Sequence, residues 1–305
     1  MAIKNLIRSL KYEGMTLLED EPMRLHTTLR IGGPVSAFVH VRDIEELQRL
    51  LLLLKESSIR YMVVGGGSNI VWPDEEMEIF VLSLSGLRYL KRIDENTIVA
   101  GGGLPLAHLV RFTVREGLQG LEGLLGIPGS VGGAIKGNAG AYGYEIKDNL
   151  RAVRIITREG VLKEFKKDEL TFDYRSSSFT DDDIIVEAEF YLKKNRSRDL
   201  ESMMRDYLHR RRQSQPINLP SAGSVFKNPP GGFAGRLIDE AGCKGMRSGD
   251  MEVSMVHANF IVNRGRGTQK DFLTLLEEVQ ERVLRRFNIL LEPEVKIIRG
   301  TVKCR

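Results

Sequence analysis

The chain has few of the residues that mark secreted, metal-binding or membrane proteins. Its two cysteines, Cys243 and Cys304, show neither a Cys-x-x-Cys pair nor the Cys/His spacing of a zinc site. The longest uninterrupted aliphatic run, residues 50–54, is far shorter than the roughly 20 residues that cross a bilayer. Basic residues interrupt the N-terminal segment, which therefore lacks the apolar stretch of a secretory signal. These absences predict a cytoplasmic protein with reduced cysteines, no membrane span and no bound metal.

The composition is that of an ordinary globular protein. Hydrophobic residues make up 42% and charged residues 28% of the chain, which excludes a disordered or collagen-like polypeptide. A length of 305 residues favours more than one domain. The net charge of +4 comes from the half that follows residue 150. That excess suits a polyanionic ligand, either a nucleic acid or a small diphosphate, and equally a solvated basic surface.

The first two thirds of the chain alternate helix and strand patterns. A helix is predicted from Asp43, with Glu46 completing a capping box. A second helix is predicted after a glycine turn, with Pro105 in its first turn. Two apolar runs around the turn 158–160 predict a hairpin, and the run 184–192 predicts a further strand.

The last third begins with a polar helix that Pro216 stops, and the boundary between the two parts is predicted near Lys194. A long helix is predicted from Thr268, and the run 292–298 predicts a final strand. The chain is therefore expected to consist of three segments, residues 1–60, 61–193 and 194–305. The long helix carries one apolar stripe, made of Phe272, Leu275, Leu276, Val279, Val283 and Leu284.

Two glycine-rich segments are the strongest candidates for a binding site. The first, Gly65, Gly66, Gly67, Ser68 and Asn69, directly follows a predicted strand. Glycine lets backbone amides approach a ligand closely and adopt positive φ, so that successive amides form an anion-binding nest. The segment matches neither the phosphate-binding loop of nucleoside triphosphatases nor the dinucleotide fingerprint that opens a helix. Alone, it favours a tight structural turn.

The second glycine-rich segment holds ten of the chain's 31 glycines between positions 117 and 143. Many of them recur at every third position, but aliphatic residues fill the intervening positions, which excludes a collagen repeat. Ordering so many glycines loses backbone entropy, which favours a bound partner over a purely structural loop. Unhindered amides from Gly129 to Gly140 are therefore predicted to line a pyrophosphate and the edge of a flat ring.

Three further motifs contain reactive residue types but specify little individually. Arg175 lies among serines in YRSSSF, a composition common in surface turns. Ser224 lies in AGSVFKNP, without the Gly-x-Ser-x-Gly elbow or the histidine and acid partners of a serine hydrolase. Glu292 and Glu294 alternate along a predicted strand, so their side chains are expected on one face, where paired carboxylates are usually solvated.

Taken together and in this order, six segments resemble the UDP-N-acetylenolpyruvoylglucosamine reductases, the MurB-type enzymes of peptidoglycan precursor synthesis. Each segment is common or weak alone, but their shared order covers roughly residues 24–300. The short interval between Arg175 and Ser224 is similar to the subclass that lacks a tyrosine-bearing loop over the substrate. The segments are HTTLRIGG, GGGSN, GLEGLLGIPGSVGGAIKGNAGAYG, YRSSSF, AGSVFKNP and LEPEVKII.

The resemblance implies an α+β fold in which a two-part α/β domain of the vanillyl-alcohol-oxidase (PCMH) type binds FAD. Residues 1–60 and 61–193 would form the two FAD-binding parts, and residues 194–305 a C-terminal α+β substrate domain. This assignment agrees with the anion-binding nest expected from the residues themselves. The cofactor-binding positions carried over are Gly65, Gly66, Gly67, Ser68, Asn69, Pro128, Gly129, Ser130, Val131, Gly132, Gly133, Asn138 and Gly140.

The resemblance also implies reduction of UDP-N-acetylglucosamine enolpyruvate to UDP-N-acetylmuramate, with NADPH as reductant. The family's catalytic positions correspond here to Arg175, Ser224 and Glu294. Arg175 would stabilise the negative charge that develops on the substrate's carboxylate. Hydride would pass from the flavin N5 to the alkene, and Ser224 would protonate the neighbouring carbon. Glu294 would need a raised pKa or a cation beside it to face a carboxylate, so its protonation state is open.

The UDP diphosphate of such a substrate accounts for the basic excess after residue 150. The protein is expected to act as a monomer, without nucleic-acid or membrane partners. Two other hypotheses fit the same residues: another FAD-dependent oxidase or dehydrogenase on the same scaffold, and a nucleotide- or RNA-binding module with the arginine run 210–212. The candidate substrate-binding residues are Tyr174, Arg212, Gln215, Lys227 and Asn228.

Overall fold

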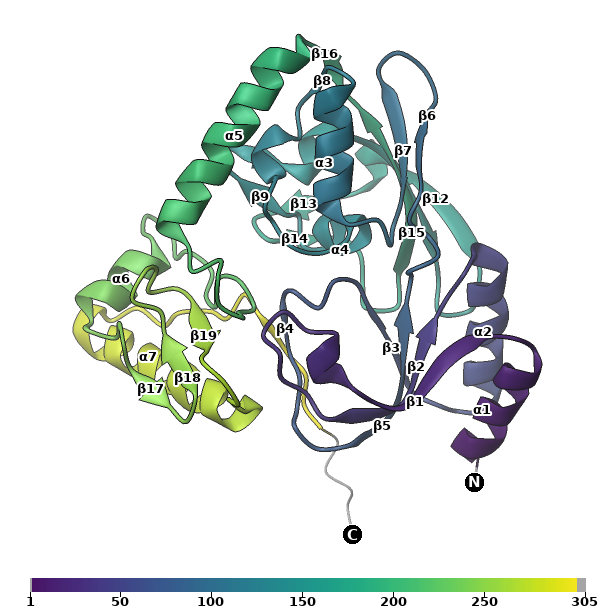
Figure 1. The fold of residues 1–305 in the computed structure, drawn as a ribbon, viewed down its shortest axis with the longest axis horizontal. Coiled ribbons are helices and arrows are strands. Elements are labelled where there is room, and N and C mark those ends of the chain that lie inside the picture. The colour runs from purple at the N-terminus through teal and green to yellow at the C-terminus, as the bar shows by residue number, and fades with distance from the viewer. Residues whose placement is uncertain (1, 301–305) are drawn as a thin grey trace. The chain divides into compact units, whose positions relative to one another are not determined.

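The computed structural model describes residues 2–300, which form two compact units (Figure 1). Both units are discontinuous in the sequence, because the chain leaves unit 1 twice before the last exchange at Arg210. By packing alone, the chain therefore divides differently from the three consecutive segments expected. Unit 1 contains Met1–Glu19, Ser36–Gly66 and Glu78–Arg210, and unit 2 contains Asp20–Val35, Gly67–Met77 and Arg211–Arg305.

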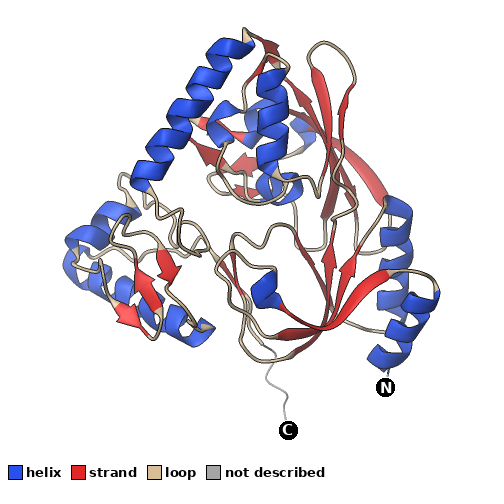
Figure 2. Ribbon diagram, viewed as in Figure 1, coloured by secondary structure: helices blue, strands red, loops and turns tan. Residues whose placement is uncertain are grey.

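Most of a four-stranded sheet lies in unit 1, with two helices packed on it (Figure 2). The helices α1 (Ala2–Tyr12) and α2 (Ile44–Glu56) bury leucines such as Leu10 and Leu50 against this sheet. The strand β3 runs parallel to β5. In spatial order, the strands are β1 (Thr16–Pro22), β2 (Pro34–His40), β5 (Met77–Ser83) and β3 (Tyr61–Val64).

The start of α2 confirms Asp43 as its N-cap. The Asp43 carboxylate accepts a hydrogen bond from the Glu46 amide at 2.8 Å. The Glu46 carboxylate, however, accepts from the Arg42 amide at 2.6 Å and does not close the capping box on Asp43. The predicted box is therefore wrong in its second half, because Glu46 is fully buried and also pairs with the Arg42 guanidinium.

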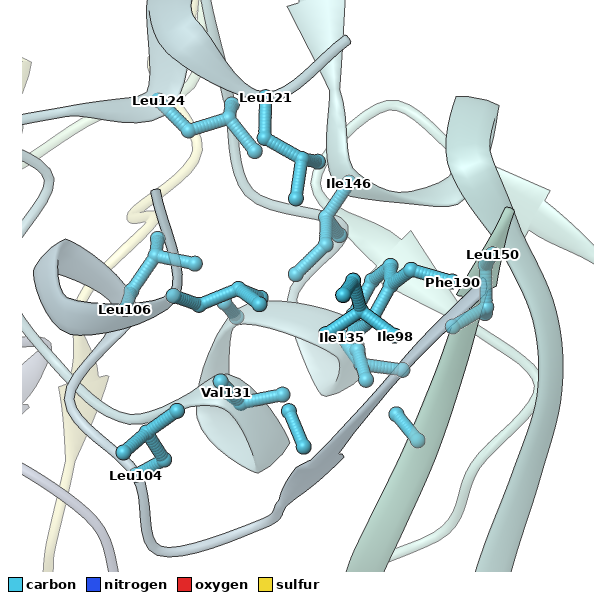
Figure 3. Close-up of a cluster of buried hydrophobic side chains, with 14 of the residues drawn as sticks. Ile98, Leu104, Leu106, Leu121, Leu124, Val131, Ile135, Ile146, Leu150 and Phe190 are labelled. Atoms are coloured by element: carbon cyan, nitrogen blue, oxygen red, sulfur yellow. The ribbon is translucent and has the colours of Figure 1, made fainter. Parts of the chain in front are cut away.

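A five-stranded antiparallel sheet forms the rest of unit 1. It confirms the predicted hairpin, which is β11–β12, and the predicted strand β15. The helices α3 (Leu106–Arg115) and α4 (Val131–Lys136) contribute to the buried cluster that Figure 3 shows. The helix α5 (Ser197–Ser214) packs partly buried residues against this cluster. In spatial order, the strands are β12 (Leu162–Lys166), β11 (Leu150–Ile156), β15 (Ile184–Tyr191), β7 (Thr97–Gly101) and β6 (Leu90–Arg92).

Short elements connect this framework. Their strands form three two-stranded pairs: β8 (Leu118–Gln119) with β16 (Lys193–Lys194), β9 (Gly140–Ala141) with β10 (Tyr144–Glu145), and β13 (Phe172–Asp173) with β14 (Ser176–Ser177). The single turns of 3₁₀ helix are Met23–Leu25, Glu122–Leu124, Ile146–Asn149 and Lys167–Glu169.

Unit 2 packs two helices against a three-stranded sheet. The helices are α6 (Ala234–Glu240) and α7 (Gln269–Phe287). The sheet has the order β17 (Arg247–Ser248), β18 (Met251–Val253) and β19 (Ile261–Asn263). The strands β4 (Ile70–Val71) and β20 (Lys296–Ile297) form a separate parallel pair, so the predicted final strand shrinks to two residues.

The helix α7 begins as predicted, with Thr268 as its N-cap and a complete capping box to Asp271. Five residues of the predicted stripe are buried in the unit 2 core. The prediction is wrong for Leu284, whose side chain is 41% exposed. Each residue turns the helix by about 100°, so Leu284 is rotated away from the core that Val283 reaches.

The structure adds three observations on membranes, metals and cysteines. No helix in the described part of the chain is long and apolar enough to cross a membrane. Between residues 2 and 300, no three His, Cys, Asp or Glu side chains group so that they could hold a metal ion. Cys243 is buried, and burial raises the pKa of its thiol. Cys304 lies outside the described residues.

Candidate FAD and substrate site

The first glycine-rich segment begins with a triglycine loop, Gly65–Gly67, at the carboxyl end of β3. The amides of these three residues donate no hydrogen bond to any residue in the range 2–300. Gly67 has a φ of +60°, a conformation that glycine adopts without strain. Successive unpaired amides beside a left-handed residue form an anion-binding concavity. The triglycine loop thus presents the donors that a diphosphate needs.

The loop packs directly against the second glycine-rich segment. An ideal Cβ on Gly65 would lie 2.3 Å from the Ser130 hydroxyl oxygen, and one on Gly66 would lie 2.8 Å from the Gly129 Cα. Real Cβ atoms essentially never approach neighbours this closely. At Gly66 the obstructing atom belongs to the backbone, so glycine is required there, whereas a Cβ at Gly65 would displace the Ser130 hydroxyl. The fold thus brings together two motifs that are distant in the sequence.

The second segment offers fewer unhindered amides than predicted. The Ser130 hydroxyl caps α4 by accepting from the Gly133 amide at 3.3 Å. The amides of Val131 and Gly132 donate to carbonyls of the turn before α3 at 2.8 and 2.9 Å. The prediction of unhindered amides is thus wrong for residues 131–134 and 137–139, because the helix cap, α4 itself and this turn use them. Val131 and Gly132 are buried, whereas Pro128 and Gly133 are exposed.

Arg175 occupies the turn of a tight hairpin beside the end of the same segment. The strands β13 and β14 pair Asp173 with Ser176, so Tyr174 and Arg175 form the turn. Arg175 has a φ of 56°, which is uncommon for a residue with a side chain. Its guanidinium donates to the Gly140 carbonyl at 2.9 Å and lies 5.0 Å from the Tyr174 ring centroid. Arg175 and Gly140, which are both predicted site residues, are therefore in direct contact in the structure.

Asn138 supports this hairpin from a fully buried position. Its Nδ2 donates to the Asp173 carbonyl at 3.0 Å and to the Glu145 carboxylate at 3.2 Å. Against the effect of burial, hydrogen bonds from Lys147 and Asn138 lower the pKa of Glu145, and the positive charge of Arg175 adds to this. Asn138 has no accessible surface, and its contacts support the hairpin that carries Arg175. Its predicted contact with a cofactor stays a prediction.

In unit 2, the end of the first glycine-rich segment is hydrogen-bonded to the segment that carries Glu294. The Asn69 side-chain amide donates to the Glu294 carbonyl oxygen at 3.1 Å. The Lys296 amide donates to the Asn69 carbonyl oxygen at 2.9 Å, next to the parallel pairing of β4 with β20. A Cβ on Gly223 would lie 3.9 Å from the Ser68 carbonyl oxygen, so AGSVFKNP also contacts this segment.

Ser224 and Glu294 lie on neighbouring backbones. The Glu294 amide donates to the Val225 carbonyl at 2.8 Å. The buried Asn259 fixes the same segment, because its side chain exchanges two hydrogen bonds with the Phe226 backbone at 2.9 and 2.8 Å. Ser224 itself is partly exposed. Two of the three predicted catalytic residues are thus brought together within unit 2, whereas Arg175 belongs to unit 1.

Thr28 connects two of these motifs and was not singled out by sequence reasoning. Its amide donates to the Gly67 carbonyl at 3.1 Å, and its hydroxyl donates to the Ser221 carbonyl at 2.7 Å. Asn259 was missed in the same way. The available signal was a polar residue inside the apolar run HANFIVN, since a buried amide is expected to have hydrogen-bond partners.

Two predicted substrate residues, Lys227 and Asn228, follow Ser224 in the same loop. Lys227 forms an ion pair with Glu292 at 2.6 Å. The Asn228 side chain accepts from the amide of Ala234, at the start of α6, at 3.0 Å. Both side chains therefore have partners within the protein that a ligand would have to replace or share.

The other predicted substrate residues lie elsewhere in the fold. Gln215 accepts a hydrogen bond from the buried Arg211 at 3.3 Å, just after α5. Arg212 is exposed near the end of that helix. Tyr174 is 42% exposed in the hairpin turn of unit 1. Each unit thus holds part of the predicted site.

Two parts of the chain match known protein families. Residues 35–166 match the FAD binding domain family. Residues 215–298 match the C-terminal domain family of UDP-N-acetylenolpyruvoylglucosamine reductase. The triglycine loop falls in the first match, and Ser224 and Glu294 fall in the second.

Similar proteins match over nearly the full length. UDP-N-acetylenolpyruvoylglucosamine reductase 2 of Symbiobacterium thermophilum is 43% identical over 292 residues, which cover 95% of each chain. The reductase of Heliobacterium modesticaldum is 43% identical over 283 residues, 92% of this chain and 90% of that one. The crystal structure of the reductase (MurB) from Thermus caldophilus is 37% identical, with a TM-score of 0.80 over 93% of this chain and 99% of that chain.

These matches confirm the predicted α+β architecture, an FAD-binding domain followed by a reductase C-terminal domain. In the structure, the glycine-rich segments and Arg175 contact one another in unit 1, and the backbones of Ser224 and Glu294 are neighbours in unit 2. The chain belongs to the UDP-N-acetylenolpyruvoylglucosamine reductase family.

Proposed function

We propose that this protein reduces the enolpyruvyl double bond of UDP-N-acetylglucosamine enolpyruvate to give UDP-N-acetylmuramate, using FAD and NADPH. The observation that carries the proposal is the triglycine loop. Its amides are unpaired within residues 2–300, and Asn69, just after it, is hydrogen-bonded to Glu294. The reaction itself comes from the shared name of the relatives, UDP-N-acetylenolpyruvoylglucosamine reductase.

The residues around the triglycine loop fit FAD. The amides of Gly65, Gly66 and Gly67 would bind its diphosphate, and Gly129 and Ser130 would line the same side of the cofactor. A Cβ at Gly65 or Gly66 would push these two walls apart. When bound, FAD supplies the hydride that the double bond accepts.

The protein's own residues would stabilise charge and supply the proton. The Arg175 guanidinium would stabilise the negative charge that develops on the substrate's carboxylate. The Ser224 hydroxyl would donate a proton to the alkene carbon next to the one that receives the hydride. A hydroxyl suffices as the donor because the carbanion at that carbon is strongly basic. Glu294, whose backbone is bonded next to Ser224, is the third group proposed at the reacting part of the substrate.

The UDP diphosphate would be bound by basic and polar side chains. Lys227 and Asn228 follow Ser224 by three and four positions in the sequence. Lys227 forms an ion pair with Glu292, so a bound diphosphate would either replace Glu292 as the partner of Lys227 or interact with Lys227 alongside it. Tyr174, Arg212 and Gln215 complete the proposed set. We further propose that the enzyme acts in the cytoplasm as a monomer, with a small-molecule substrate and neither nucleic-acid nor membrane partners.

Flavin absorption tests the reaction in two steps. Anaerobic addition of NADPH should bleach the flavin absorption, and the enolpyruvyl sugar should then restore it. Ser224→Ala should retain the bleaching and lose turnover, because only the proton donor is removed. Ser202→Ala, an exposed serine on α5, is the control and should behave as the wild type. Protein that neither binds FAD nor recovers colour with the sugar would contradict the proposed reaction, and full turnover by Ser224→Ala would contradict the serine's role alone.

A further inference from the structure

Unit 1 has a groove outside the proposed FAD and substrate residues. It lies between β6 and α3, which Figure 1 labels, and has a volume of about 380 Å³. Ligand sites for small molecules typically measure about 300–1,000 Å³, so this volume can hold a small organic ligand. Four basic residues and three apolar residues line the groove: Arg88, His108, Arg111 and Arg115, with Leu90, Leu104 and Phe112.

The four basic side chains are exposed and have no hydrogen-bond or ion-pair partner in the described range 2–300. The acidic residue next in sequence, Glu116, is occupied by an ion pair with Arg92 at 2.7 Å. Arg111 and Arg115 are four residues apart on α3, where two like charges destabilise a helix. A bound anion would remove this repulsion.

The other part of the lining is apolar. Leu104 is buried, and Leu90 and Phe112 are half-buried, so the groove has an apolar floor beneath a cationic rim. Arginine is the residue that matches phosphate with paired hydrogen bonds, and an aromatic or aliphatic floor suits a flat ring. The combination selects a ligand with both a phosphate and a ring.

We propose that this groove binds a small phosphate ester that carries a flat ring, of the class of the nucleoside monophosphates. The phosphate contacts Arg111 and Arg115, and the ring lies on Phe112 and Leu90. The groove is connected to the proposed FAD site through backbone contacts, because the Leu104 carbonyl accepts from the Val131 amide at 2.8 Å. The binding itself does not depend on the proposed reaction.

Calorimetric titration of the FAD-saturated protein with adenosine monophosphate tests this site. Saturation with FAD blocks the cofactor site, and the loss of binding in Arg111→Gln distinguishes the groove from the proposed substrate site. We expect Arg111→Gln to weaken binding at least 10-fold and rising salt to weaken it further. Arg49→Gln is the matched control, because Arg49 is an exposed arginine on α2 with no hydrogen-bond or ion-pair partner among the described residues, and it should leave the affinity unchanged.

Two comparisons separate the phosphate from the ring. Inorganic phosphate and adenosine, titrated separately, should each bind at least 10-fold more weakly than the monophosphate. The proposal is overturned if the wild type does not bind adenosine monophosphate at millimolar concentration, or if Arg49→Gln weakens binding as much as Arg111→Gln. It is also overturned if Arg111→Gln loses FAD, since the groove would then belong to the cofactor site.

Discussion

Replacing Gly66 with alanine tests whether the contact between the two glycine-rich segments builds the FAD site. The added Cβ would lie 2.8 Å from the Gly129 Cα. The Gly129 Cα is a backbone atom and the position of the Cβ is fixed by its own backbone, so no side chain can rotate away to make room. Ordinary van der Waals contact begins at 3.4 Å, so one segment has to move by about 0.6 Å.

The expected loss of affinity follows from this displacement. Overpacking of this kind costs about 1–3 kcal/mol. The exposed loop relaxes more easily in the apoprotein than around a bound cofactor, so most of the cost should fall on the FAD complex. The dissociation constant for FAD should therefore rise by about 5- to 150-fold, while the unfolding of the apoprotein changes less.

Titration of the apoprotein with FAD, followed by the change in flavin fluorescence, measures this constant. Gly137→Ala is the control in the same segment, because its Cβ would meet nothing closer than the Gly133 carbonyl oxygen at 3.6 Å. The control should bind FAD like the wild type. The reasoning is refuted if Gly66→Ala binds FAD with wild-type affinity, or if Gly137→Ala loses as much.

Three other substitutions test the supporting structure. Thr268→Ala removes the N-cap of α7 and should lower the free energy of unfolding by about 1 kcal/mol in urea. Thr274→Ala, at a half-buried position in the interior of the same helix, removes no cap and should destabilise less. Hydrogen bonds from Arg264 and then Arg247 lower the pKa of Glu252 in the folded protein. The ionised carboxylate therefore stabilises the fold fully above the unfolded pKa of about 4.3, and this contribution is lost as the pH falls through the lower folded pKa. Glu252→Gln should therefore be less stable at neutral pH and flatten the acid limb of a stability–pH curve; an unchanged limb would contradict this. Thr28→Val should reduce kcat with little change in Tm, and a large fall in Tm with normal kcat per folded molecule would show a purely structural role.

Local patterns predict the fold well where one element carries the signal. Thr268 begins α7 as predicted, because the groups that fix this start, Thr268 and Asp271, lie within one turn of the helix. The hairpin β11–β12 follows from one turn and two flanking strands. The second half of the α2 box fails because Glu46 has a competing contact with Arg42, which a capping pattern does not include.

The division into units is not readable from local patterns. Residues 20–35 and 67–77 pack in unit 2 although they lie within the first quarter of the chain or just beyond it. Contacts with distant segments place these residues in unit 2, such as the hydrogen bond from the Thr28 hydroxyl to the Ser221 carbonyl and the pairing of β4 with β20. Such contacts depend on tertiary packing, and no composition shift marks them.

The candidate site shows the same contrast. Arg175, Ser224 and Glu294 can be named from the resemblance, because each sits in a motif that the family shares. Asn138 and Asn259 hold two of these motifs in place, and each does so through a buried side-chain amide. A buried amide is stabilising only when its partners are in reach, and those partners lie in other parts of the chain.

The glycines themselves fall into two physical classes. At Gly65 and Gly66, the missing side chain allows the close contact with residues 129–130 and also leaves exposed amides without partners, which a ligand can use. At Gly102 and Gly103, a Cβ would lie 2.1 Å from the Ile185 carbonyl oxygen and 1.8 Å from the Leu84 carbonyl oxygen, so the missing side chain serves packing. Composition alone counts both classes equally. Unpaired amides, and not glycine density, therefore identify which part of a glycine-rich sequence faces a ligand.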